Sequence, residues 1–210
     1  MTAITKPPKQ RTEVRQAGLV EAALQLAAQH SPTDITTGDL ARAVGISQGA
    51  VFKHFASKEA IWLAVLDWAT DTLMRRLAIA ASTQPALAAL RAVFMAHVAF
   101  VVEQPGVPRV IFQELQSPDD TALKARVRTL MQRYRQLLIK LLQQAQQEKT
   151  IAPDTDMQAA TVLFIGAIQG LVMQAMISGD VAAMAAQAPG VLTIYQRGLQ
   201  NRPTDSQGTP

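Results

Sequence analysis

The sequence predicts an all-α protein. Apolar residues make up 49% of the 210-residue chain but aromatic residues only 5%, so its core must consist mainly of Leu, Ala, Val, Ile and Met. This composition favours helices over strands. Apolar residues recur at helical spacing along most of the chain, and no stretch shows the alternation of a strand. The sequence contains no internal repeat.

The N-terminal part is expected to contain a long helix after a polar arm. Residues 1–10 include Pro7-Pro8 and basic side chains, and we expect them to be a disordered basic arm. The first helix is predicted from about Arg11 to Gln29, with apolar positions at helical spacing. A loop follows at residues 31–34, where Ser, Pro, Thr and Asp cluster.

Residues 36–55 predict two short helices joined by a tight turn. Thr36 can cap the first helix, and Asp39 stands three residues later as its partner in a capping box. Gly45 can adopt the left-handed conformation that ends a helix abruptly. Ser47 can then cap a second helix from Gln48 to about His54. This arrangement is a helix-turn-helix, whose second helix lies in the DNA major groove, so the sequence predicts DNA binding.

Prolines and glycines divide the remainder into further helices, with Gln104–Pro108 as a break between two of them. The helices are expected at about residues 58–82, 85–103, 109–116, 120–149, 156–178 and 181–200. Pro189-Gly190 is expected to bend or split the last one. Residues 201–210 read as a disordered tail.

Composition excludes several classes of function. The chain has no cysteine, which rules out disulfides and Cys-ligated zinc. The three histidines are far apart, and the sequence shows no metal-ligand spacing, phosphate loop or nucleophile motif. We therefore expect no enzyme activity, no metal and no cofactor. The basic face of the predicted helix at 120–149 would suit an anionic ligand or a second nucleic-acid surface. A solvated face is the better explanation of these charges.

Location follows from the absence of targeting signals. The N-terminus lacks the apolar run of a signal peptide. The longest apolar stretch, residues 162–177, is interrupted by Gln169 and Gln174 and is shorter than a membrane span. We expect a cytoplasmic protein with no membrane contact. Its net charge is +4, and residues 1–58 carry seven basic and four acidic side chains, a balance that suits DNA but would also suit a solvated face.

The segment from Leu19 to Ile61 resembles the DNA-binding domain of the TetR (tetracycline-repressor-like) family of bacterial transcriptional regulators. The matching positions keep a fixed spacing without a gap. They are Leu19-Val20, Ala22-Ala23, Thr36, Asp39-Leu40-Ala41, Ala43 to Ser47, Gly49, Phe52 to Phe55 and Ser57-Lys58-Glu59. The resemblance implies a DNA-binding domain at residues 11–57, followed by a helical effector-binding and dimerisation domain at residues 58–200.

Base contacts are expected at the N-terminal end of the second motif helix. Gln48 is the one long polar side chain there, and glutamine can pair with adenine N6 and N7; the alternative is a solvated side chain. Gly49 lets the backbone approach closely, and Ala50 can touch a thymine methyl group. Lys53 and His54 are better placed for phosphates.

Other positions are expected to contact the DNA backbone. The family often has tyrosine where this chain has Phe52, so the phosphate bond of that hydroxyl is missing here. Lys58 opposes the dipole at the start of its helix, and the resemblance implies phosphate binding as its purpose. Thr36 is expected to cap its helix, with or without a phosphate contact. The full DNA-binding set is Arg11, Thr36, Thr37, Gln48, Gly49, Ala50, Phe52, Lys53, His54 and Lys58.

The resemblance implies that the C-terminal part dimerises through its last two helices and binds a small molecule among the middle ones. Small and apolar residues at regular spacing suggest the dimer interface, with an internal helix contact as the alternative: Ala159, Leu163, Gly166, Gly170, Met173, Ala183, Ala186 and Tyr195. Candidate effector contacts, each of which taken singly is better explained as ordinary core, are Phe94, His97, Val101, Phe112, Tyr134, Phe164, Ile168 and Gln169.

Two functions compete. The first is a homodimeric repressor that binds an inverted-repeat operator in double-stranded DNA and is released by a small, mostly apolar effector. The second is a helix-turn-helix DNA-binding protein that has no small-molecule ligand and is controlled by a protein partner. Thermal melts against apolar compounds would distinguish them, because a bound effector raises apparent stability.

Overall fold

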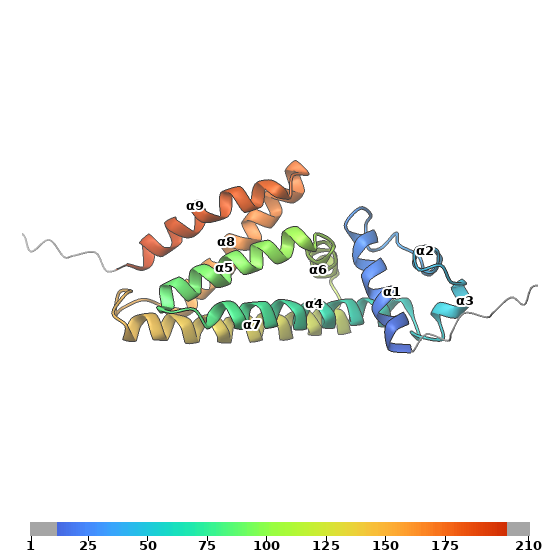
Figure 1. The fold of residues 1–210 in the computed structure, drawn as a ribbon, viewed down its shortest axis with the longest axis horizontal. Helices are drawn as coiled ribbons and strands as arrows, with labels where there is room; N and C mark the ends of the chain where they lie inside the picture. Colours follow the sequence, from blue (N-terminus) through green and yellow to red (C-terminus); the bar gives the residue numbers. More distant parts are fainter. Residues whose placement is uncertain (1–11, 201–210) are drawn as a thin grey trace, which may run out of the picture. The chain divides into compact units, whose positions relative to one another are not determined.

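The computed structural model describes residues 12–200 (Figure 1); the expected basic arm, Arg11 and the expected tail lie outside this range. All regular structure in the described part of the chain is helical, as predicted. The helices are α1 (Thr12–Ala27), α2 (Thr37–Ala43), α3 (Gln48–Val51), α4 (Lys58–Ala81), α5 (Ala86–Glu103), α6 (Gly106–Gln116), α7 (Ala122–Gln147), α8 (Met157–Ser178) and α9 (Ala182–Leu199).

The chain divides into two compact units. Among the described residues, the first unit comprises 12–69 and 104–126, and the second comprises 70–103 and 127–200. Helices α4 and α7 therefore contribute residues to both. The sequence analysis placed the domain boundary after residue 57, and nothing in the sequence indicated that α6 belongs with the N-terminal helices.

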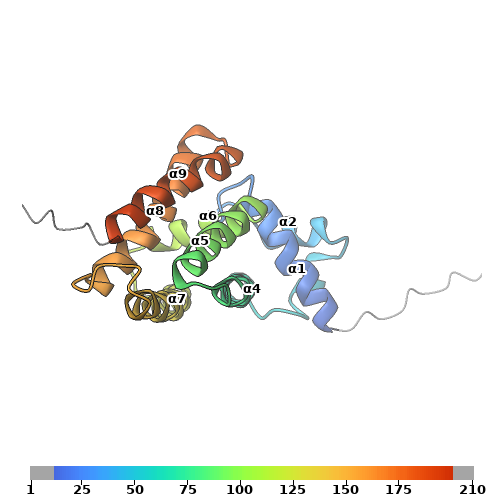
Figure 2. The same cartoon turned by 60° about the vertical axis from the view of Figure 1, so that its left-hand side comes forward.

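In the first unit, α1 lies between α6 on one side and α2 with α3 on the other (Figures 1 and 2). The inward faces of these helices are apolar. Leu19 of α1, Leu40 of α2 and Val51 of α3 have no exposed surface. Burial of each such side chain stabilises the unit by about 1.5–3 kcal/mol, which gives two very short helices a fixed position.

In the second unit, α5 packs against both α8 and α9 and lies between them and the α4 and α7 segments (Figure 2). Aromatic rings fill the centre. The ring of Phe164 on α8 meets those of Phe94 and Tyr195 edge-on, at centroid distances of 5.2 and 5.4 Å. Edge-to-face pairs of this kind are a favoured arrangement of aromatic side chains.

Several helix limits differ from the sequence predictions. Helix α3 ends at Val51 instead of near His54, because the next residues form tighter turns in which His54 N–H bonds to the Val51 carbonyl. Helix α6 starts at Gly106, three residues earlier than expected. Pro108 falls in its first turn, where a backbone N–H is not needed. Helix α9 runs without a break through Pro189.

Candidate nucleic-acid interface

The start of α2 is fixed by the predicted capping box. The Thr36 hydroxyl accepts from Asp39 N–H at 3.1 Å and donates to Asp39 Oδ2 at 2.7 Å, while Thr36 N–H donates to the same oxygen at 2.9 Å. These bonds, with a smaller contribution from Arg42 at 3.3 Å, lower the pKa of Asp39. Because Thr36 already donates its hydroxyl hydrogen to Asp39, a phosphate would have to compete for it.

The turn between the two helices is a Schellman motif, which explains the role of Gly45. This residue has φ +69°, and its N–H bonds to the Arg42 carbonyl at 3.2 Å. The N–H of Ile46 bonds to the Ala41 carbonyl at 2.9 Å. The two bonds satisfy carbonyls at the end of α2 and turn the chain sharply, as the sequence predicted for a glycine there.

Helix α3 begins with a Ser47 cap, whose hydroxyl accepts from Ala50 N–H at 3.3 Å. This cap leaves Gln48 and Gly49 exposed at the first turn of the helix. The Gln48 side chain is nevertheless not free: its Nε2 donates to the Thr37 hydroxyl at 2.8 Å. The structure thus brings together Gln48 and Thr37, two residues of the expected DNA-binding set that the sequence did not pair.

The residues after α3 are held from α1. The side-chain amide of Gln16 donates to the backbone carbonyl of His54 at 2.9 Å. His54 Nδ1 is buried and has no hydrogen-bond partner in the described part of the chain. Lys53 is exposed, and Phe52 is 50% exposed.

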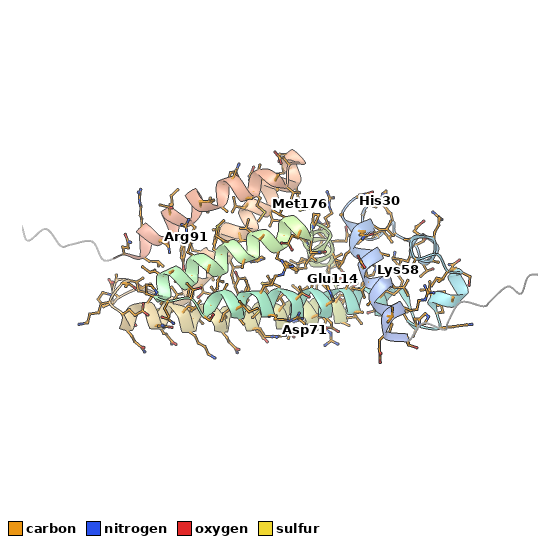
Figure 3. The ribbon with its side chains drawn as sticks, viewed as in Figure 1. His30, Lys58, Asp71, Arg91, Glu114 and Met176 are labelled. Atoms are coloured by element: carbon orange, nitrogen blue, oxygen red, sulfur yellow. The ribbon has the colours of Figure 1, made fainter. Side chains whose placement is uncertain are left out.

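Lys58, labelled in Figure 3, has an internal role in addition to the expected phosphate contact. Its Nζ donates to the backbone carbonyl of Thr33 at 2.9 Å, which fastens the first turn of α4 to the loop before α2. The bond also explains a cation at a helix start, because the ammonium group is directed away from the helix and toward a carbonyl.

Six of the eight candidate effector contacts lie in the second unit near its aromatic centre. Phe94, Tyr134, Phe164, Ile168 and Val101 are buried, and His97 is partly buried. Phe112 instead belongs to α6 in the first unit, and Gln169 is exposed on α8. The aromatic centre of the second unit therefore contains only part of the expected set of effector contacts.

His97 and Tyr134 form a polar pair inside this cluster. His97 Nδ1 lies 3.2 Å from the Tyr134 hydroxyl oxygen, and the rings meet edge-on at 5.3 Å. Burial lowers the pKa of His97 to about 4 and raises the pKa of Tyr134 well above its usual value. At neutral pH the pair is uncharged, which suits an apolar environment.

An exposed face of α8 contains most of the residues expected at a dimer interface. Residues spaced alternately by four and three positions are all exposed: Ala159, Leu163, Gly166, Gly170, Met173 and Ile177. On α9, Ala186 and Ile194 are also exposed and Ala183 is partly so. Tyr195 differs, because it is buried and donates to the Ala160 carbonyl at 3.1 Å within the same chain.

A groove of about 630 Å³ runs between α8 and α9 and is lined in part by Ala159, Leu163 and Ile194. It coincides with this exposed face, and of the aromatic rings described above only Tyr195 lines it. A second groove, of about 720 Å³, lies in the first unit beside Leu26, Asp34 and Arg42. The described residues contain no group of three or more His, Asp or Glu side chains able to bind a metal ion.

Two helices, α5 and α8, are long and apolar enough to cross a membrane by length and composition alone. The sequence argument was therefore incomplete, because it counted only residues 162–177 and treated Gln169 and Gln174 as interruptions, whereas α8 is apolar enough over 22 residues. In each helix 44% of the apolar window is buried inside the protein, and core helices pass the same test.

Comparison with known proteins agrees with this architecture. Residues 19–65 match the sequence model of the bacterial regulatory proteins of the tetR family, and residues 86–189 match that of the tetracyclin repressor-like C-terminal domain. Together the two matches cover well over half of the chain. The first extends over α2 and α3, and the second over α5 to α8.

Curated relatives include the nucleoid occlusion factor SlmA of Vibrio cholerae, which is 27% identical over 79% of this chain and 83% of its own length. SlmA of Glaesserella parasuis is 28% identical over 59% of this chain and 62% of its own length, so the chain matches less than two thirds of that relative.

Solved structures share the fold. The transcriptional regulator FadR from Bacillus subtilis in complex with stearoyl-CoA superposes with a TM-score of 0.76 at 18% identity, over 88% of this chain and 99% of that one. The ketosteroid transcriptional regulator KstR2 of Mycobacterium tuberculosis gives 0.71 at 21% identity, over 90% and 96%. The chain belongs to the TetR family of bacterial transcriptional regulators, which are DNA-binding proteins and not enzymes.

Proposed function

We propose that the protein is a homodimeric transcriptional repressor that binds an inverted-repeat operator and is released by a small, mostly apolar effector. The observation that supports DNA binding is the exposed first turn of α3, where Gln48 and Gly49 directly follow the Schellman turn at Gly45 and the Ser47 cap. A recognition helix uses its N-terminal residues to reach base edges, so this end is the one expected in the major groove.

Phosphate contacts from neighbouring positions would orient α3. Lys53 and Phe52 are exposed one turn beyond Gln48, and His54 beside them is partly buried. The carbonyl of His54 accepts a hydrogen bond from Gln16, so this segment is tied to α1 before DNA arrives. Such preorganisation reduces the ordering cost of binding.

Dimerisation through α8 and α9 is supported by the exposed face described above. Its four-three spacing is that of a helix seam that packs against another helix. Gly166 and Gly170 lie on this face with nothing within 4 Å of the position a Cβ would take, so a second helix can approach closely. A monomer would leave Ile177 73% and Ile194 74% exposed, which favours a partner copy as the cover.

Control by an apolar effector is supported by the aromatic cluster of the second unit. It combines apolar rings with one uncharged polar pair, His97 and Tyr134, which is the composition of a small-molecule site. The fold is shared with a regulator solved in complex with stearoyl-CoA, whose acyl chain is apolar, and with a ketosteroid transcriptional regulator. We infer an effector of that general character and a cytoplasmic location.

Binding to double-stranded fragments of the protein's own promoter region tests the central proposal. We expect a footprint with two half-sites centred about 34–36 Å apart, or a multiple of that distance, and an affinity that falls steeply between 50 and 200 mM salt. Removal of the protein should raise expression of a reporter behind the same promoter. A single non-palindromic footprint, or no salt-sensitive binding, would contradict the proposal.

Control by a protein partner is the second candidate, and the match to nucleoid occlusion factors over most of their length supports it. A thermal-shift screen with long-chain acyl-CoA esters, sterols and other apolar compounds separates the two. An effector at 100 times its Kd should stabilise the protein by about 2.7 kcal/mol and release it from DNA. Control by a protein partner instead predicts that no such compound shifts the melting temperature. It also predicts that a protein fraction releases this protein from DNA.

A further inference from the structure

The two helices of the motif are joined at their starts by one side-chain hydrogen bond. Thr37 is the first residue of α2 and Gln48 the first residue of α3, and Gln48 Nε2 donates to Thr37 Oγ1 at 2.8 Å. The two residues are eleven positions apart and meet across the turn at Gly45. Gln48 is exposed and Thr37 is partly buried, so the bond lies at the edge of the surface that α3 presents.

Both partners of this bond are anchored by backbone structure. The capping box at Thr36 fixes the start of α2, and the Ser47 cap fixes the start of α3. A glutamine on a helix surface normally samples many rotamers, and immobilising it on binding costs conformational entropy. A bond to a hydroxyl on a fixed helix limits that freedom before the protein meets DNA.

The hydrogen-bonding capacity of Gln48 leaves room for a base. Its amide nitrogen has two hydrogens, and only one is donated to Thr37. The second hydrogen can be donated to adenine N7, while Oε1 accepts from the adenine N6 amino group. The Thr37 hydroxyl accepts from Gln48 and therefore still has its own hydrogen to donate, for which a DNA phosphate oxygen is the natural acceptor.

We propose that Thr37 is a positioning residue for base readout: its hydroxyl links a DNA phosphate to Gln48 and holds the amide in the orientation that selects adenine. The proposal rests on the proposed function, because it assumes that α3 enters the major groove. The hydrogen bonds would run from the DNA phosphate through Thr37 to Gln48 and the base. The position of the protein on the DNA backbone would thereby determine how Gln48 meets one base pair.

A purely structural role for the Thr37 side chain is the competing explanation. The capping box, however, is made by Thr36 and Asp39, and the Thr37 hydroxyl takes no part in it. Valine has the shape of threonine without the hydroxyl and is tolerated in the first turn of a helix. Thr37→Val should therefore remove the bond to Gln48 and leave α2 in place.

The experiment starts with the full-length protein selecting its own operator from random-sequence duplexes. Affinities are then measured for this operator, for copies in which each A·T pair is changed to G·C, and for copies with 7-deazaadenine, which lacks the N7 acceptor, at each adenine. The proteins compared are the wild type, Thr37→Val, Thr37→Ser, Gln48→Ala and the double variant with Thr37→Val and Gln48→Ala. Thermal melts establish that each variant is folded.

We expect one adenine whose replacement, or 7-deaza substitution, weakens wild-type binding roughly 5-fold or more, the effect of one or two hydrogen bonds. Thr37→Val should reduce that preference roughly 5-fold, and Thr37→Ser, which keeps the hydroxyl, should retain it within about twofold. Gln48→Ala should abolish the preference. In the Gln48→Ala background, Thr37→Val should change it no further, because Thr37 acts on the base through Gln48.

Other outcomes overturn the proposal. A wild type that ignores 7-deazaadenine at every position excludes the adenine pairing without the use of any variant. Thr37 is a phosphate contact alone if Thr37→Val weakens binding to all duplexes equally. The same conclusion follows if Thr37→Val lowers affinity by the same factor in the wild type and in the Gln48→Ala background. Both results leave the proposed function intact, whereas a wild type that selects no duplex at all removes the proposed function together with this inference.

Discussion

Gly106, at the start of α6, lies so close to α1 that no other residue fits without a backbone shift. A Cβ built on Gly106 would come within 2.2 Å of the Leu24 carbonyl oxygen and 3.2 Å of Ala28 N. Both atoms belong to the last turn of α1 and its continuation, where the Leu24 carbonyl accepts from Ala28 N–H at 3.0 Å. The absence of a side chain at this position is therefore what allows α6 to pack on α1.

Gly106→Ala should destabilise the protein by roughly 1–3 kcal/mol, the usual cost of forcing extra atoms into a packed contact. Urea denaturation measures the loss. Operator affinity should fall as well, since a displaced α1 no longer holds the segment that follows α3.

Gly18→Ala provides the matched control. Gly18 lies inside α1 with nothing within 4 Å of its Cβ position, so alanine there should stabilise the helix by about 0.5–1 kcal/mol. Equal effects at the two glycines would mean that the close contact at Gly106 has no energetic weight.

Gln16→Leu should weaken DNA binding by a route independent of direct contact. The substitution keeps the size of the side chain but leaves the partly buried His54 carbonyl without its donor, at a cost of about 1–3 kcal/mol. Because that carbonyl belongs to the segment after α3, the loss should appear as a roughly 5-fold or greater rise in operator Kd, measured by fluorescence anisotropy.

Gln25→Leu is the control for this prediction. Gln25 lies on the same helix and is exposed, and within the described residues its side chain donates to Glu21 of α1 at 3.4 Å. Its replacement should leave operator affinity within about twofold of the wild type, as expected for a surface position outside any such contact. If Gln16→Leu behaves in the same way, the bond to His54 does not position α3.

The parts of the fold that the sequence predicted well are those decided by local chemistry. Thr36, Gly45 and Ser47 fix the motif because a cap or a left-handed turn depends on only a few neighbouring residues. Gly179 ends α8 in the same way, with φ +75°. These signals can be read from a window of a few residues, and those at Thr36, Gly45 and Ser47 were found where they were predicted.

The contacts that the sequence analysis missed join residues far apart in the chain. Gln16 and His54 are separated by 38 positions, and a glutamine on a helix gives no local sign of its partner. Gly106 was taken as part of a break between helices, because its role becomes visible only once α1 lies against it. Phe112 was grouped with residues of the second unit since apolar spacing shows that a side chain is buried but not in which unit.

Stability should decline as pH falls through the range set by His97. Its pKa is lowered to about 4 in the folded protein from an ordinary value of 6.5, so between these values the unfolded chain binds more protons. The contribution of neutral His97 to the free energy of unfolding is complete above pH 6.5 and is lost as the pH approaches 4. The total loss is at most ~3 kcal/mol. His97→Gln should remove this part of the pH dependence in urea denaturation curves, whereas His30→Gln, at an exposed position, should leave it in place.

Ile194→Glu should weaken the dimer. Ile194 is 74% exposed on α9 and lines the groove shared with Leu163 of α8, so a second copy packed there would bury a carboxylate among apolar side chains. We expect the dimer Kd to rise at least ~10-fold, about 1.4 kcal/mol, with a parallel loss of affinity for a two-half-site operator. Sedimentation velocity measures the first effect and anisotropy the second.

Ile79→Glu distinguishes a specific interface from a general effect of added charge. Ile79 belongs to α4 within the same unit and is 69% exposed, so it matches Ile194 in residue type and accessibility but lies on neither α8 nor α9. Its substitution should leave both the dimer and operator binding unchanged. If the two variants dissociate the dimer equally, or if Ile194→Glu remains dimeric, the partner copy does not pack on the α8–α9 face.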